Sequence, residues 1–225
     1  SINQALTFET TNEEFKKRNI AFGQPQMQTL KLIFTDDLYT NLGMLLSEQC
    51  PYTIKAAVFE GTSQNIFKDR REFSGSLMRQ LNEVYDYIDL HNQTHATFQK
   101  LLRIDTRDYP EVAVREALLN SLVHRDYSFR ASTLVSIYDD RIEFVSIGGL
   151  LPGLELDDLM MGISVCRNPD LANVFYRLFC CKGSKGDDLN YTVLSVFLLH
   201  IFDNFRTTGV TKIHINIWHG NTLRI

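Results

Sequence analysis

The spacing of hydrophobic and polar positions changes repeatedly along the chain between a helical and a strand-like period, which predicts a mixed α and β protein. The clearest helix is SGSLMRQLNEVYDYIDLHN (74–92), in which apolar residues recur every three or four positions. They are Leu77, Leu81, Val84, Tyr85 and Ile88. Alternating segments predict a strand over TIKAAVFEGT (53–62), and two more over STLVSIYDD (132–140) and RIEFVSIGG (141–149), which are joined by a turn at Asp139-Asp140.

Weaker signals predict the remaining elements. Thr11 and Glu14 have capping-box spacing, which predicts a helix starting at Asn12, and Pro25 lies at the first turn of a helix over 24–34. We expect short helices over 154–162 and 168–179, the latter capped by Asn168. We also expect single strands over FQKLLRID (98–105) and TKIHINIW (211–218). The basic cluster KDRR (68–71) favours a solvated loop over a phosphate-binding patch.

Composition narrows the class of protein. The chain has 225 residues, 44% of them hydrophobic, with a net charge of −4, so it has no general attraction to nucleic acid. Its longest apolar run, 193–202, contains a histidine and is shorter than the roughly 20 residues that span a bilayer. Four cysteines without CxxC spacing favour free thiols in a cytoplasmic protein and do not support a zinc site. Since the first residue is Ser, we expect a piece of a longer polypeptide.

One predicted helix carries polar residues where an apolar stripe would be expected. It starts at Tyr109-Pro110-Glu111 and includes REALLNSLVHRDYS (115–128), in which Glu116, Asn120 and His124 recur every four residues. Residues four apart on a helix drift by only about 40° around its axis, so these three form one stripe. The rest of the helix is almost entirely apolar, and burying unpartnered polar groups is costly. The stripe must therefore face a cavity, a hydrogen-bond network or a ligand.

Two interpretations of this stripe follow from the residues alone. The first is a structural network that ties the helix to a neighbouring loop. The second is a magnesium–nucleotide site, because an Asn oxygen is a suitable Mg²⁺ ligand and a Glu one turn earlier can orient or deprotonate a water. The glycine-containing loop GGLLPG (148–153) has the composition of a phosphate-binding loop.

A longer series of motifs resembles a known family. From REALLNSLVHRDYS through VSIYDDRIEFVSIGGLLPG to NPDLANVFYRL, the chain resembles the divergent histidine-kinase-like ATPase domain of bacterial RecG-related ATP-dependent helicases and transcriptional regulators. Upstream, YTNLGMLLSEQCP, IKAAVFEG and FSGSLMRQL resemble the segment that follows an AlbA-like nucleic-acid-binding domain in that family. The resemblance implies an α+β fold of the Bergerat type, an α/β sandwich with a mixed, largely antiparallel sheet. It divides the chain into a smaller α+β segment (1–105) and an ATPase-type domain (106–225).

The resemblance also implies roles for individual residues. Glu116 would be the catalytic base, and Asn120 would be the ligand of Mg²⁺ bound with ATP. The other implied nucleotide-binding residues are His124, Arg125 and Asp126 beside the helix, and Gly148, Gly149 and Gly153 in the loop.

The chain departs from the family pattern at two places. ATPases of this class carry Asp-x-Gly-x-Gly after the strand, with the Asp accepting from the adenine amino group, whereas this chain has Ser146 at the Asp position. Relatives also have a Gly-Thr-Gly-like phosphate loop, where this chain has Gly183-Ser184-Lys185-Gly186 in a different context. These residues fit either a substitute phosphate loop or a surface turn, and a third interpretation is that the chain after Leu178 is a diverged or frame-slipped tail.

Two functions remain open on this basis. One is a nucleotide-binding regulatory module, a slow ATPase that contacts nucleic acid through a domain outside this chain. The other is a degenerate dimerisation or scaffold domain of the same kind of regulator, which binds no nucleotide and forms a homodimer. No Walker-type or other helicase motor motif is present, so helicase activity of this chain is not supported. No membrane partner is expected.

Overall fold

The computed structural model describes residues 1–149, 151–153, 158, 161, 165–179 and 212–218. Three short helices open the chain: α1 (Glu9–Lys17), α2 (Gln24–Thr29) and α3 (Asn41–Leu46). They are followed by β1 (Ile54–Phe59), β2 (Phe67–Phe73), α4 (Leu77–His91), β3 (Thr94–Gln99), β4 (Leu102–Arg107) and α5 (Glu111–Val123). The remaining elements are β5 (Thr133–Ile137), β6 (Arg141–Ile147), α7 (Pro169–Phe179) and β7 (Lys212–Trp218).

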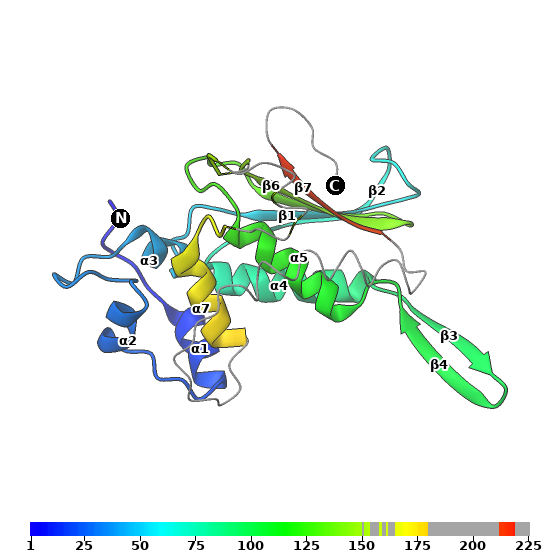
Figure 1. Ribbon diagram of the computed structural model, residues 1–225, viewed down its shortest axis with the longest axis horizontal. Helices are drawn as coiled ribbons and strands as arrows, with labels where there is room; N and C mark the ends of the chain where they lie inside the picture. Colours follow the sequence, from blue (N-terminus) through cyan, green and yellow to red (C-terminus); the bar gives the residue numbers. More distant parts are fainter. Residues whose placement is uncertain (150, 154–157, 159–160, 162–164, 180–211, 219–225) are drawn as a thin grey trace.

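The main sheet has the strand order β2-β1-β5-β6-β7 and is mixed. Strand β1 runs antiparallel to β2 but parallel to β5, while β6 runs antiparallel to β5 and parallel to β7. Helices α4 and α5 lie side by side against one face of this sheet, and α7 and α1 lie beside them (Figure 1). This layered arrangement of helices on a mixed sheet confirms the predicted α+β class.

The hydrophobic core lies between the sheet and these helices. Strand β6 shows why: its alternate residues Ile142, Phe144 and Ser146 are buried, while the residues between them are half-buried. This alternation is the two-residue period of a strand with one face against the core. On the helix side, Val84 and Ile88 of α4 are buried in the same cluster, as the sequence predicts.

The predicted domain boundary near residue 105 falls inside β4. Strands β1 and β2 precede it, and β5 and β6 follow it, yet all of them belong to one sheet through the pairing of Ile54 with Thr133. Among the described residues, a second, separate sheet contains β3 and β4, which form a ribbon that projects beyond the ends of α4 and α5 (Figure 1). No helix in the described ranges is long and apolar enough to cross a bilayer.

Three local predictions need correction. Helix α1 begins at Glu9 rather than Asn12 and has no capping box, because the Thr11 hydroxyl donates to Leu46 O at 2.6 Å and Glu14 pairs with Lys17 and Arg18. The KDRR cluster is solvated as predicted, but it lies in strand β2 at the sheet edge, where charged side chains are tolerated on both faces.

The third correction concerns FQKLLRID, which is a hairpin rather than a single strand. Lys100 adopts a positive φ of 56° and turns the chain between β3 and β4. The other elements agree better with their predictions: Pro25 lies in the first turn of α2, although that helix ends at Thr29, and α7 and β7 form where expected. The predicted helix over 154–162 and the glycine-rich segment 183–186 lie outside the described residues, apart from residues 158 and 161.

Candidate functional site

Helix α5 is buried on nearly all sides. It packs against β6, α4 and α7, so its apolar residues face neighbours in several directions. Pro110 occupies the N-cap position and Glu111 the first turn, where its negative charge suits the helix dipole. The helix ends at Val123, and the N–H of His124 still donates to Asn120 O at 3.0 Å. The stripe of Glu116, Asn120 and His124 therefore runs from the middle of the helix to its C-terminal end.

Asn120 is the least satisfied polar side chain of the stripe. It is 3% exposed, and neither its side-chain oxygen nor its side-chain nitrogen has a hydrogen-bond partner among the described residues. A buried amide without partners costs about 1–3 kcal/mol, and most such groups in folded proteins are satisfied. The Asn120 side chain therefore has one acceptor oxygen and two N–H donors that no described residue uses.

Glu116 lies one turn before Asn120 and is 4% exposed. Its Oε1 accepts from Arg115 Nη1 at 2.9 Å. Burial raises the pKa of the Glu116 carboxyl above its usual 4.5, and the Arg115 charge opposes this effect only in part. A carboxyl with a raised pKa in a buried setting is suited to accept and return a proton.

His124 ends the stripe in a setting that favours its neutral form. Burial lowers the pKa of the imidazole below 6.5, and the nearby positive charge of Arg167 lowers it further. Neutral imidazole can both donate and accept a hydrogen bond. At neutral pH the stripe thus contains a carboxyl, an amide and an uncharged imidazole.

The loop after β6 lies directly against the end of α5. Gly148 has φ +142°, and a Cβ at this position would lie 3.1 Å from His124 O and 3.2 Å from Asp126 N. Only glycine combines this backbone conformation with so close an approach. The N–H of Asp126 donates to Ile147 O at 2.6 Å, which fixes the contact. The structure thus brings His124 and Asp126 close to Gly148.

Arg167 joins the two sides of this contact. Its Nη2 donates to Gly149 O at 2.6 Å, and its Nη1 lies 3.5 Å from Asp126 Oδ2. Asp126 also accepts from the backbone and hydroxyl of Ser128, which together with Arg167 lowers the pKa of its carboxyl. A guanidinium therefore lies beside the glycines and His124.

Arg125 is directed to a different set of partners. Its guanidinium lies over the rings of Tyr52 and Tyr127, with centroid distances of 4.9 and 5.3 Å. It donates to Thr133 Oγ1 at 3.0 Å and to Ala131 O. These contacts fix the chain between α5 and β5, and the Arg125 guanidinium is directed to residues outside the stripe. Gly153 is exposed with φ +89°, and a Cβ there would meet nothing within 4 Å, so the structure does not bring it against the stripe.

Ser146, which the resemblance places where related ATPases carry an adenine-binding Asp, is 3% exposed in β6. Its hydroxyl donates to Ser121 O of α5 at 2.5 Å. The side chain thus connects the sheet to the helix. An adenine amino group at this position would need a hydrogen-bond acceptor. The hydroxyl oxygen of Ser146 is a weaker acceptor than a carboxylate.

Comparison with known protein families gives a match within the second half of the chain. Residues 131–214 match the family model described as "Putative ATP-dependent DNA helicase recG C-terminal". This part of the chain is similar to the ATPase-like domain of RecG-related proteins. The match begins after α5, so the stripe lies just upstream of it. The search of curated proteins finds no match.

A solved structure supports the fold of this ATPase-like domain and the residues before it. The DIP2311 protein from Corynebacterium diphtheriae superposes with a TM-score of 0.67 and 18% sequence identity. The superposition covers 78% of this chain but only 36% of that protein. The chain thus spans about a third of the length of this relative, and the likeness concerns the fold alone.

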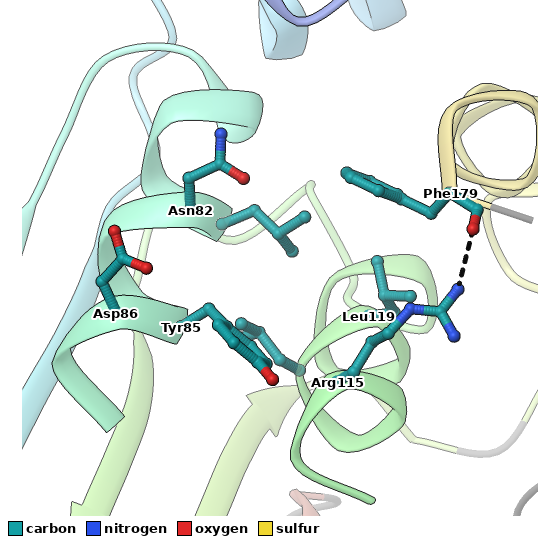
Figure 2. Close-up of a pocket in the computed structure, with 8 residues that line it drawn as sticks. Asn82, Tyr85, Asp86, Arg115, Leu119 and Phe179 are labelled. Atoms are coloured by element: carbon teal, nitrogen blue, oxygen red, sulfur yellow. Dashed lines mark hydrogen bonds between the residues drawn. The ribbon is translucent and has the colours of Figure 1, made fainter. Parts of the chain in front are cut away.

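A separate pocket of about 190 Å³ lies between α4, α5 and the end of α7. Figure 2 shows Asn82, Tyr85 and Asp86 on one side and Arg115, Leu119 and Phe179 on the other. Arg115 connects this pocket to the stripe, because its Nη1 lies by Glu116 while its Nη2 donates to Phe179 O at 3.5 Å (Figure 2). No stripe residue lines the pocket, so the two are distinct.

Sequence reasoning missed Arg167 and understated Asn168. The Asn168 amide donates to Val123 O and Arg125 O, both at 2.7 Å, and so satisfies carbonyls at the end of α5. The sequence signal for both residues was present: a polar pair directly before Pro169 at the start of a helix in the ATPase-like domain. Its meaning depended on knowing that this helix start lies beside the end of α5.

Proposed function

We propose that the ATPase-like domain binds a nucleotide with magnesium along the stripe of α5. Asn120 would be the magnesium ligand, and Glu116 would orient or deprotonate the water that attacks the terminal phosphate. The single observation that carries this proposal is the buried Asn120 side chain, whose oxygen and nitrogen have no partner among the described residues. The match of residues 131–214 to an ATPase-like family supports the same ligand class.

The residues present fit the phosphate and metal part of such a ligand. Asn120 offers an amide oxygen, which is a suitable hard ligand for Mg²⁺. Arg167 places a guanidinium beside Gly149, where a phosphate oxygen would find a charged donor. When bound, magnesium would neutralise part of the phosphate charge. The adenine part fits less well, because Ser146 replaces the carboxylate acceptor and bonds to Ser121.

The protein groups would act as follows. Glu116, with its raised pKa, would hold the proton taken from the attacking water, and Arg115 at 2.9 Å would steady the carboxylate. His124, kept neutral by its surroundings, would donate or accept a hydrogen bond at the ligand. Gly148 would keep the loop close to α5 so that Asp126 and Arg167 stay in place.

The proposal extends to a regulatory role in a RecG-related protein. Nucleotide binding or slow hydrolysis here would be coupled to nucleic acid bound by other parts of such a protein. The net charge of −4 supports assigning nucleic-acid contact elsewhere than these 225 residues.

A second candidate function has one observation in its favour. Ser146 ties β6 to α5 at the position where an adenine-binding Asp is expected. This substitution favours a domain that kept the fold as a scaffold and lost nucleotide selectivity. The two candidates differ in whether Asn120 has a ligand.

Thermal unfolding of the 225-residue chain with ATP, ADP and a non-hydrolysable analogue, with and without Mg²⁺, tests the proposal. A ligand at about 100 times its Kd stabilises the folded state by about 2.7 kcal/mol, which raises the Tm by roughly 5–10 °C in a chain of this size. We expect a rise that requires Mg²⁺ and is lost in Asn120→Ala.

Matched variants locate the binding. Asn82→Ala removes an amide from the other pocket and should leave the shift unchanged, whereas Glu116→Gln should keep the shift and lose any hydrolysis. A shift lost in Asn82→Ala but kept in Asn120→Ala would move the nucleotide to the α4–α5–α7 pocket. No shift at millimolar nucleotide would contradict the proposal and favour the scaffold.

A further inference from the structure

The β3–β4 ribbon stands apart from the rest of the molecule. It leaves the body beyond the ends of α4 and α5 and extends away from the sheet (Figure 1). Its sheet contains only these two strands among the described residues, so both outer edges carry backbone groups without a strand partner. Its apolar residues Phe98, Leu101 and Leu102 are 71%, 101% and 65% exposed.

These features favour pairing of the ribbon with a further β-strand. A two-stranded hairpin alone is marginally stable in water, and exposed strand edges bearing apolar side chains are ready to pair with another strand. The backbone geometry shows which residues are available. Asp108 N donates to Gln93 O, and in an antiparallel ladder the direction alternates, so Arg103 and Asp105 direct their N–H and C=O groups outward from β4.

The charges on the outer edge of β4 are self-complementary in one register. If two β4 strands pair antiparallel about a two-fold axis at Ile104, Arg103 lies opposite Asp105 of the second copy, and the reverse holds. Arg103 and Asp105 of the second copy would also form a hydrogen-bonded backbone pair, because both residues direct their N–H and C=O groups outward from β4. An axis at Arg103 or at Asp105 would instead place like charges opposite each other, which is unfavourable. Charge therefore selects the Ile104 register.

The side chains beside Arg103 and Asp105 support the same register. Phe98 is the cross-strand neighbour of Arg103, so each aromatic ring would flank an interchain ion pair. On the opposite face, Ile104 would meet Ile104 of the second copy, and Leu102 would meet Thr106. We propose that β4 is a dimerisation edge, at which a second copy of this chain pairs to form the four-stranded sheet β3-β4-β4-β3.

Nucleic acid is a poorer fit for the ribbon. Arg103 Nε donates to Asp105 at 2.7 Å, and Arg107 pairs with Asp89 and Glu111, so these guanidiniums are already neutralised by carboxylates. A phosphate-binding ribbon would instead present uncompensated positive charge.

Sedimentation analysis of two charge-reversal variants, alone and mixed, tests the register. Arg103→Asp and Asp105→Arg each place like charges opposite one another, so each variant should dimerise at least about tenfold more weakly than the wild type. Mixed in equal amounts, they restore both opposite-charge pairs and should form a heterodimer. A role of Arg103–Asp105 within one chain would not produce this rescue. Arg130→Asp, an exposed loop change, should leave dimerisation unaltered.

A cysteine on the axis gives an independent readout. Cα atoms of a non-hydrogen-bonded antiparallel pair lie about 4.5 Å apart, within the range of a disulfide. Under mild oxidation, Ile104→Cys should therefore form a covalent dimer, while wild type and Thr106→Cys should not. A wild type that stays monomeric at high concentration, or variants that fail to form a heterodimer, would overturn the proposal.

Discussion

Helices α4 and α5 lie side by side on the same sheet, yet they distribute their polar side chains differently (Figure 1). Helix α4 is amphipathic, with charged residues such as Arg79 and Glu83 in solvent and one buried amide, Gln80. The Gln80 Nε2 donates to Tyr52 O at 2.8 Å and to Gly75 O at 2.6 Å, while its Oε1 has no partner among the described residues. In α5, by contrast, the buried amide of Asn120 bonds to nothing among the described residues.

Under the proposed function, this difference distinguishes a structural amide from a ligand-binding one. A buried polar group whose donors are used by the fold stabilises it, whereas one whose donors and acceptors are unused lowers stability until a ligand arrives. Burial alone therefore does not distinguish the two helices, since both amides are almost inaccessible. The hydrogen-bond partners do, and substitutions can test this distinction.

The largest expected effect concerns the end of α5. Arg125→Met should lower the free energy of unfolding by about 3 kcal/mol, because Thr133 Oγ1 and Ala131 O lose a charged donor and two tyrosines lose their guanidinium contact. Urea unfolding of the variant and the wild type measures this change in the free energy of unfolding. The matched change on α4, Arg79→Met, removes an exposed ion pair and should cost under about 0.5 kcal/mol. Equal costs would mean that the tyrosine contacts contribute little.

The matched changes Gln80→Leu and Asn120→Leu should alter the free energy of unfolding in opposite directions. Gln80→Leu should destabilise the protein by about 2 kcal/mol, since two backbone carbonyls lose their donor. Asn120→Leu should stabilise the ligand-free protein by about 1 kcal/mol, because an unpartnered amide is replaced by an apolar side chain of similar size. Thermal unfolding of both variants without nucleotide measures these two changes in stability. If Asn120→Leu is as destabilising as Gln80→Leu, the stripe is a structural network.

Replacing Glu116 should have a smaller effect on stability, and this effect should depend on pH. Its pKa is raised on folding, so the folded protein keeps the proton at pH values where the unfolded chain has lost it, and stability falls as pH rises through that window. Glu116→Gln removes this loss and should be about 1 kcal/mol more stable than wild type at pH 7. Below about pH 4 the two should converge. A constant difference across this pH range would exclude the buried carboxyl as its cause.

His124 should give the smallest effect, with the opposite pH dependence. Its pKa is lowered on folding, so below pH 6.5 the unfolded chain binds a proton that the folded protein does not, and stability falls on acidification. His124→Gln should flatten the stability profile between pH 7 and pH 5, by about 0.5–1 kcal/mol at the acidic end. An unchanged slope would assign the acid sensitivity to other groups.

The sequence predicted those elements whose signals are local. The apolar spacing of α4, the alternation of β5 and β6 and the polar stripe of α5 each lie within one segment, and the structure confirms these elements. The ribbon was mispredicted because Lys100 and Leu101 carry no glycine, proline or asparagine signal for a turn.

The site was only partly accessible from the sequence for the same reason. Arg125 looked like a pocket residue beside His124, but Tyr52, far earlier in the chain, holds its guanidinium. Arg167 lies beside His124 only because α7 begins next to the end of α5, where Asn168 bonds to Val123 O. Such contacts between distant segments are not encoded in any local period.

The parallel pairing of β1 with β5 has a consequence for how the chain reaches its fold. The hairpins β1–β2 and β5–β6 can form from neighbouring residues, but joining them requires closing a loop that contains α4, the ribbon and α5. During synthesis, β1 can pair with β5 only after Thr133 and its neighbours have left the ribosome. The interval before this pairing is when the nascent chain is most exposed to aggregation and to chaperones.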